Sequence, residues 1–222
     1  MRRRLRPPDV PELAIRLRAL EETWRGRRLD SDPLLFPHRY GRPEDREAAA
    51  FLASSLAFGR VASINASLER LFAALGPQPA ATLREAAGDV RGLEGFVHRW
   101  VDAGSLRPFL RSVGETLRAE GSLGALFASG DEGGPDFVPA LDRFFSVLRE
   151  RTAVPARRFP RGLRFLLPTP GDGSACKRAH LFLRWTVSGH NISNAVGYWV
   201  YTGSTGKPGY VRQAPTREHI DA

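Results

Sequence analysis

The segment LLPTPGDGSACKRAHLFLRW, residues 166–185, decides the fold that we expect, because a turn rich in proline and glycine separates two apolar stretches. Gly171 and Gly173 tolerate backbone angles that other residues avoid, and Pro170 fixes its own φ angle, so the segment predicts a tight turn. Ser174 is a favourable N-cap for a helix that follows the turn. The whole pattern is typical of a helix–hairpin–helix unit.

The helix expected after the turn has an apolar face and a basic face. The apolar residues at helical spacing are Ala175, Ala179, Phe182 and Trp185. Lys177, His180 and Arg184 fall on the opposite face. Amide groups at a helix start attract anions, so a hairpin followed by cations predicts a binding site for a phosphate group. Lys177 would lie about three residues inside this helix, where the helix dipole disfavours a positive charge.

Positive charge is concentrated in two parts of the chain, whose overall net charge is +9. Residues 1–28 contain nine arginines against four acidic residues, a net charge of +5. Residues 151–184 contain eight basic residues against Asp172 alone, a net charge of +7. Residues 29–150 have a net charge of −4, from thirteen arginines and seventeen acidic residues. Clustered positive charge indicates a polyanionic partner, most simply nucleic acid. A compositional bias is the alternative, because the chain has 31 arginines and only two lysines.

The sequence RRFPRGLRF, residues 157–165, places four arginines around two phenylalanines. This combination suits contacts with a nucleic-acid backbone, while a solvent-exposed basic helix remains the competing interpretation. The residues that we expect to bind nucleic acid are Arg161, Arg164, Gly171, Gly173, Ser174, Arg178 and Arg184.

Helical spacing of apolar residues dominates the chain up to about residue 187, which predicts an all-α fold. Asp9 and Glu12 form a capping-box pattern at the first helix. The helices that the spacing predicts before the hairpin cover residues 12–24, 43–58, 61–75, 79–87, 93–103, 106–120, 122–128 and 137–148.

The composition changes at about Ser188. Residues 188–222 contain three of the four tyrosines but only two of the 31 arginines. We therefore expect a helical domain over residues 1–187 and an atypical tail over residues 188–222, which a frameshift or a fusion would explain. An ordinary C-terminal extension is the alternative.

Two segments closely resemble an uncharacterised bacterial family, a domain of unknown function: DSDPLLFPHRYGRPEDREAAAFLASSLAFGRV, residues 30–61, and the hairpin segment. The resemblance covers about residues 8–187, and the family is similar in turn to the helix–hairpin–helix DNA glycosylases. The similarity implies that amides around Gly171 and Gly173 hold a DNA phosphate. It also implies that Lys177 is the nucleophile that attacks C1′ of a damaged nucleotide.

The sequence departs from the glycosylase pattern in two places. Lys177 stands four residues after Gly173, later than the lysine of common glycosylases. Glycosylases also carry a downstream catalytic aspartate, and nothing after Val187 matches that segment, so we do not assign the role to Asp221. The resemblance therefore implies a chain that is incomplete at its C-terminus and lacks part of the catalytic site.

Other features exclude several kinds of site. The single cysteine, Cys176, excludes an internal disulfide and a cysteine-rich metal site, fits a reducing cytoplasm, and is expected to be a small, partly buried residue. The acidic residues near His38 form a weak metal candidate, but acids are common at helix starts. We expect neither a metal nor a cofactor. We also expect no membrane association, because no apolar run approaches the length of a membrane span. Phe36 and Tyr40 are expected to pack against the helix over 43–58.

The function that we expect is nucleic-acid binding, with duplex DNA as the simplest partner, by a protein that resembles a base-excision glycosylase/lyase. Two alternatives remain open at this point. One is a non-catalytic DNA- or RNA-binding module, and the other is an inactive truncated product. The sequence leaves the oligomeric state undetermined.

Overall fold

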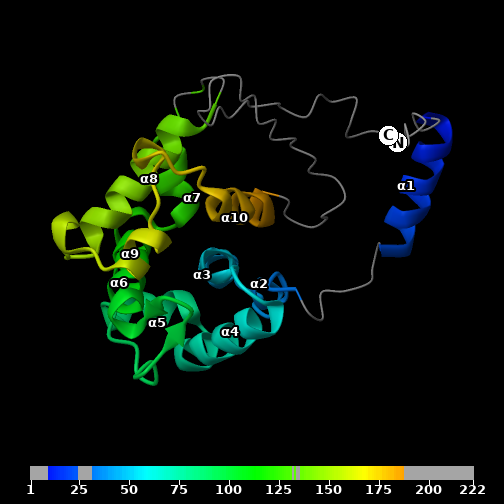
Figure 1. Ribbon diagram of the computed structural model, residues 1–222. Helices are drawn as coiled ribbons and strands as arrows, with labels where there is room; N and C mark the ends of the chain where they lie inside the picture. The colour runs from blue at the N-terminus through cyan, green and yellow to red at the C-terminus, as the bar shows by residue number, and fades with distance from the viewer. Residues whose placement is uncertain (1–9, 25–31, 132, 134–135, 188–222) are drawn as a thin grey trace, which may run out of the picture.

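The structure, a computed structural model, describes residues 10–24, 32–131, 133 and 136–187 of the chain. The α-helices are α1 (Val10–Trp24), α2 (Leu35–His38), α3 (Pro43–Leu56), α4 (Val61–Leu75), α5 (Pro79–Ala86), α6 (Ala103–Glu120), α7 (Leu123–Ala128), α8 (Val138–Arg151), α9 (Arg161–Leu166) and α10 (Lys177–Val187). Two short 3₁₀-helices, η1 (Ala156–Arg158) and η2 (Pro170–Asp172), flank α9 (Figure 1). The all-α class is confirmed, while Asp9 of the capping-box pattern and the tail over 188–222 lie outside the described residues.

The predicted helix over residues 93–103 is wrong. This segment contains two short antiparallel strands, β1 (Val97–His98) and β2 (Val101–Asp102). Gly95 and Arg99 have positive φ angles of 64° and 57°, which a continuous right-handed helix cannot contain. Apolar spacing alone could not distinguish this turn-rich segment from a short helix.

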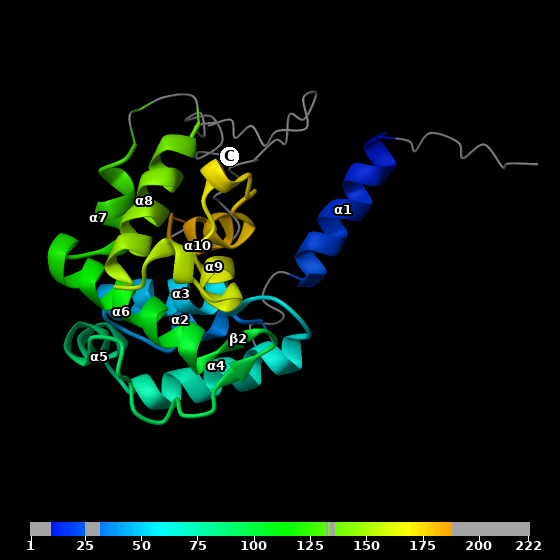
Figure 2. The ribbon, with the colours of Figure 1, turned by 60° about the vertical axis from the view of Figure 1, so that its left-hand side comes forward.

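Helix α3 lies at the centre of the core, and ten of its fourteen residues are buried. Figures 1 and 2 show α10 beside α3, and the two helices are in contact. Phe51 of α3 contacts three other helices, with ring centroids 5.6 Å from Phe109 of α6, 5.6 Å from Phe144 of α8 and 5.1 Å from Phe182 of α10. Truncating such a buried ring costs about 3–5 kcal/mol of folding free energy. Phe51 therefore packs α3 against α10, the helix that follows the hairpin.

The segment around α2 packs as a connector. Phe36 is buried and stacks on Phe72 of α4, with ring centroids 5.3 Å apart, and Tyr40 lies 5.9 Å from the same ring. Arg39 donates two hydrogen bonds to the Glu69 carboxylate, at 2.8 and 2.5 Å. We expected Phe36 and Tyr40 to pack against the helix over 43–58. Helix α2 does contact α3, but the ring that both residues contact, Phe72, belongs to α4.

The acidic residues near His38 stabilise local structure and helix starts. Asp32 accepts a hydrogen bond from the Leu34 amide at 2.8 Å. The buried carboxylate of Asp45 accepts one from the Ala80 amide of α5 at 2.9 Å. Glu47 accepts two from the first amides of α7, at 2.9 and 2.8 Å. Such carboxylates satisfy amides that a helix cannot bond internally. In the described part of the chain, no three potential metal ligands gather.

Helix α1 exposes four large apolar side chains: Leu13, Ile15, Leu17 and Leu20. Among the described helices, none combines the length and the apolar character that crossing a bilayer requires.

Candidate nucleic-acid interface

A basic cleft of about 960 Å³ lies among α8, η1, α9, the hairpin and the start of α10. The residues that line it are Arg149, Ala156, Phe159, Arg161, Arg164, Phe165, Pro168, Asp172, Ser174 and Arg178. A smaller cavity of about 230 Å³ adjoins it, and its lining residues are Pro168, Ser174, Ala175, Cys176, Lys177 and Arg178. Three residues belong to both linings, so the two hollows are neighbouring parts of one surface. Asp172 is the one acidic residue in either lining.

A glycine brings α9 into position beside the cleft. Gly162 is buried, and a Cβ atom there would lie 2.5 Å from the Ser105 hydroxyl oxygen and 2.9 Å from the Trp100 carbonyl oxygen. Only a glycine permits so close an approach between α9 and the start of α6. Arg161 and Arg164 lie on either side of Gly162, three residues apart and therefore on one face of the helix. Both are exposed, so the buried glycine turns the two arginines outward.

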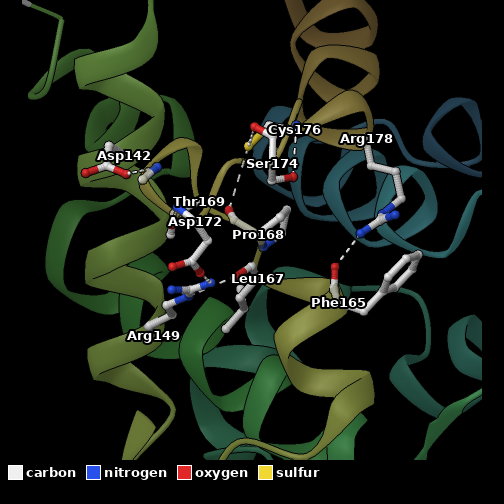
Figure 3. Close-up of polar contacts among 11 residues, drawn as sticks. Asp142, Arg149, Phe165, Leu167, Pro168, Thr169, Asp172, Ser174, Cys176 and Arg178 are labelled. Carbon is white, nitrogen blue, oxygen red and sulfur yellow. Dashed lines mark hydrogen bonds and ion pairs between the residues drawn. The ribbon is translucent and has the colours of Figure 1, made fainter. Parts of the chain in front are cut away.

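The hairpin between α9 and α10 is held by its own hydrogen bonds and by α8 (Figure 3). Thr169 accepts a bond from the Asp172 amide on its hydroxyl at 3.2 Å and one from the Ser174 amide on its carbonyl at 3.3 Å. Gly173 has φ +77° and donates to a carbonyl within the turn. The Gly171 amide donates to Asp142 of α8 at 3.1 Å. An anion that binds the Gly171 amide must therefore displace a carboxylate first.

Helix α10 begins later than the sequence predicts. The Ser174 hydroxyl does not cap it, because it accepts a hydrogen bond from the Cys176 amide at 3.2 Å within the turn. Cys176, with φ +45°, takes the capping position, and its carbonyl accepts bonds from the Ala179 and His180 amides. Lys177 is therefore the first residue of α10 rather than its third, and its side chain is exposed beside the smaller cavity.

Cys176 is buried under the hairpin, as the sequence predicts for a small residue near a helix start. Its sulfur lies 3.8 Å from the Pro168 carbonyl oxygen and 3.6 Å from the Ser174 carbonyl oxygen. Burial raises the pKa of the Cys176 thiol to about 11. The thiol therefore stays protonated at neutral pH and is a poor nucleophile.

Arg178 turns back from α10 toward the body of the protein. Its guanidinium donates a hydrogen bond to the Phe165 carbonyl oxygen and lies 3.7 Å from the centroid of the Phe165 ring (Figure 3). The Phe58 ring is 5.6 Å away. Burial lowers the pKa of Arg178 to about 10, well above neutral pH, so the group is charged. Its charge is held by π faces and one carbonyl rather than by a carboxylate.

The other cleft arginines differ in their partners. Arg149 forms an ion pair with Asp172 at 2.6 Å and donates to the Leu167 carbonyl oxygen at 2.8 Å. The hydrogen bond from Arg149 lowers the pKa of the Asp172 carboxyl. Arg161 lies 5.2 Å from the Trp100 ring centroid. The Arg164 side chain makes no hydrogen bond or ion pair within the described residues. One cleft arginine is thus neutralised by a carboxylate, and three are not.

The structure brings together five of the eight residues proposed from the sequence as site residues. Arg161, Arg164, Ser174, Lys177 and Arg178 line the two hollows, and Gly171 and Gly173 lie in the hairpin beside them. Arg184 is exposed in the last turn of α10 and lines neither hollow.

Sequence reasoning missed Arg149, and it named Phe159 and Phe165 of the lining only as part of a basic stretch, without assigning them as site residues. The phenylalanines carried a signal, because they alternate with arginines in RRFPRGLRF. Arg149 carried none, since it lies on α8, in a part of the chain with a net negative charge. Only the packing of α8 against η2 brings it to the cleft.

No curated protein and no solved structure matches the chain. A family model described as "Protein of unknown function (DUF2400)" matches residues 32–202, about three quarters of the chain. The matched range contains every residue of the two hollows, begins after α1, and extends fifteen residues beyond Val187, the boundary that we expected from the sequence. The chain therefore belongs to the DUF2400 family.

Proposed function

We propose that the basic cleft binds the sugar–phosphate backbone of nucleic acid, and that the ligand is duplex DNA. The observation that carries the proposal is a cleft of about 960 Å³ that four arginines line, against one carboxylate already paired with an arginine. Arginine suits this task because its planar guanidinium bonds two phosphate oxygens at once. Arg149, Arg161 and Arg178 come from three different helices, so the folded protein gathers cations that are far apart in the sequence. A DNA-binding role also fits the cytoplasm that we expect as the location.

Duplex binding at several salt concentrations tests this function. We expect the logarithm of the affinity to fall with the logarithm of salt concentration with a slope of about −3, from three to four neutralised phosphates. Reversing two exposed cleft charges, Arg161→Glu with Arg164→Glu, should weaken binding by about a hundredfold and flatten the slope.

Arg91→Glu with Arg60→Glu is a matched control. Both arginines are exposed, line neither hollow and make no side-chain hydrogen bond or ion pair within the described residues. The control changes the net charge by the same amount as the cleft variant, so it should lose much less affinity. Equal losses in the two variants, or binding that ignores salt, would show that the cleft is not the binding surface.

Base excision with lyase chemistry is a second candidate, and the position of Lys177 beside the smaller cavity favours it. In this reaction the lysine amine attacks C1′ of an abasic sugar, and an imine forms with loss of water. The smaller cavity has no acidic residue in its lining, so no carboxylate there replaces the assisting aspartate of a glycosylase. Nucleic-acid binding is therefore the better-supported function.

Borohydride trapping on abasic-site DNA tests the lyase candidate. The chain has only two lysines, so Lys177→Ala and Lys207→Ala are a matched pair of variants. Lyase chemistry at Lys177 predicts that the trapped complex disappears in the first variant and persists in the second. A complex that forms equally in both would exclude Lys177 as the nucleophile.

A further inference from the structure

Arg178 is an unusual cation in this protein, because it is largely buried and has no carboxylate partner among the described residues. The comparably buried Arg151 and Arg149 contact Glu120 and Asp172, each at 2.6 Å. The Nε atom of Arg178 is buried without a hydrogen-bond partner, and the carbonyl of Phe165 accepts from its Nη2. Removing a charge from water without an opposite charge is costly, so a folded protein rarely keeps such a group without a use for it.

The place of Arg178 in the fold shows what that use is. Arg178 belongs to the linings of both hollows, together with Ser174 and Pro168. The neighbouring Lys177 lines the smaller cavity, and Asp172, the one carboxylate of the cleft, is paired with Arg149. An anion that enters where the hollows meet therefore finds two cations and a hydroxyl group, and meets no unpaired carboxylate of either lining.

We propose that Arg178 is the binding residue for one phosphate group, seated where the cleft and the smaller cavity meet. The proposal rests on the proposed function for the source of that phosphate, a nucleic-acid backbone. The Phe165 and Phe58 rings hold the guanidinium in place and leave its charge uncompensated, unlike a carboxylate. The incoming phosphate supplies the missing opposite charge, so binding and folding stability are linked at this residue.

Thermal unfolding with and without inorganic phosphate tests the site directly. Phosphate at about 10 mM should raise the Tm of the native chain by about 3 °C over chloride of equal ionic strength. In Arg178→Met, which keeps the length of the side chain and removes the charge, the rise should vanish. Without phosphate, the Tm of this variant should stay within about 2 °C of the native value, because the lost contacts with Phe165 are offset by the absence of a buried charge.

Arg178→Lys is the second variant, which keeps the charge and loses the planar fork. It should keep part of the phosphate response, while Arg91→Met, which removes an exposed charge outside both hollows, should keep all of it. If Arg178→Met responds to phosphate as the native chain does, Arg178 is not the phosphate ligand. If Arg178→Met does not fold, Arg178→Lys decides the question. A full phosphate response in folded Arg178→Lys, which lacks the planar guanidinium, would equally show that Arg178 is not the phosphate ligand.

Duplex binding by the same variants separates this proposal from the proposed function. Arg178→Met should bind duplex DNA about tenfold more weakly, the loss expected for one charged hydrogen-bonding partner. Duplex affinity that is unchanged in Arg178→Met but lost in the Arg161 and Arg164 double variant would refute the Arg178 site and leave the cleft function standing. If the phosphate response depends on Arg178 but the chain binds no nucleic acid, the Arg178 site stands and the proposed function is refuted.

Discussion

Arginine side chains have different interaction partners in two regions of this molecule. Among the described residues from α2 to α8, six arginines outside the cleft form ion pairs with carboxylates: Arg39, Arg42, Arg107, Arg111, Arg118 and Arg151. In the cleft, Arg161 and Arg178 lie over aromatic rings instead, and Arg149 alone has a carboxylate. The same residue type therefore pairs with carboxylates in one region, within a helix or between elements, and keeps most of its charge uncompensated in the other.

The difference shows that net charge is informative only when the partners are known. An exposed arginine paired with a carboxylate contributes a few tenths to about 1 kcal/mol to stability and projects little positive potential. An arginine that an aromatic ring holds keeps its geometry and its full potential. The net charges, −4 over residues 29–150 and +7 over residues 151–184, differ in the same direction, although cleft Arg149 belongs to the first range and ion-paired Arg151 to the second.

Adding a carboxylate where the two hollows meet should reduce the difference between the regions. We expect Ser174→Asp, on the wall that both hollows share, to weaken duplex binding by at least about tenfold, because the new carboxylate competes with phosphate for the cations. The change can be followed by fluorescence anisotropy. Ser174→Asn is the matched control, since it also accepts the Cys176 amide bond but adds no charge. Equal affinities for the two variants would show that the uncompensated charge near Ser174 is not used in binding.

Removing the one carboxylate of the cleft should sharpen the comparison in the opposite direction. Asp172→Asn frees Arg149 from its ion pair, so we expect duplex affinity to rise by about two- to fivefold. Asp89→Asn is the control, because it removes a negative charge that pairs with Arg107 outside the cleft. Titrations at matched ionic strength would contradict the prediction if both variants gained the same affinity.

The sequence predicted the part of this comparison that depends on local pattern. Apolar residues three and four apart located most of the helices before the hairpin to within a few residues, because burying one face of a helix imposes that spacing. Gly171 and Gly173 located the turn, and Arg161, Arg164 and Lys177 were recognised as cations beside it.

The parts that depend on tertiary structure were not predictable. The direction of Arg178 is set by Phe58 and Phe165, residues on other elements, and helical spacing says nothing about a long side chain that folds back. The start of α10 moved because the Ser174 hydroxyl bonds the Cys176 amide inside the turn, a choice that short polar side chains have wherever a helix begins. Arg149 reaches the cleft only through the packing of α8.

The smallest effect is expected for the arginines that carboxylates already neutralise. Arg39→Met removes the bonds to Glu69 and keeps an aliphatic chain over Phe36, so unfolding at pH 7 should cost about 0.5–1 kcal/mol less, with duplex affinity unchanged. The hydrogen bond from Arg39 lowers the pKa of the Glu69 carboxyl in the folded state. Its contribution to stability is therefore present above the unfolded pKa of about 4.3 and is lost as the pH falls through the lower folded value.

Urea unfolding of the native chain and Arg39→Met at a series of pH values measures this dependence. The gap between the two free energies of unfolding should be full at pH 7 and should close as the pH falls through the lowered folded-state pKa of Glu69. A gap that persists unchanged in acid would show that Arg39 acts through its packing on Phe36 rather than through Glu69. A loss of duplex affinity in Arg39→Met would contradict the comparison itself. An arginine that is paired with a carboxylate outside the cleft would then contribute to duplex binding, and the two regions would not differ in this respect.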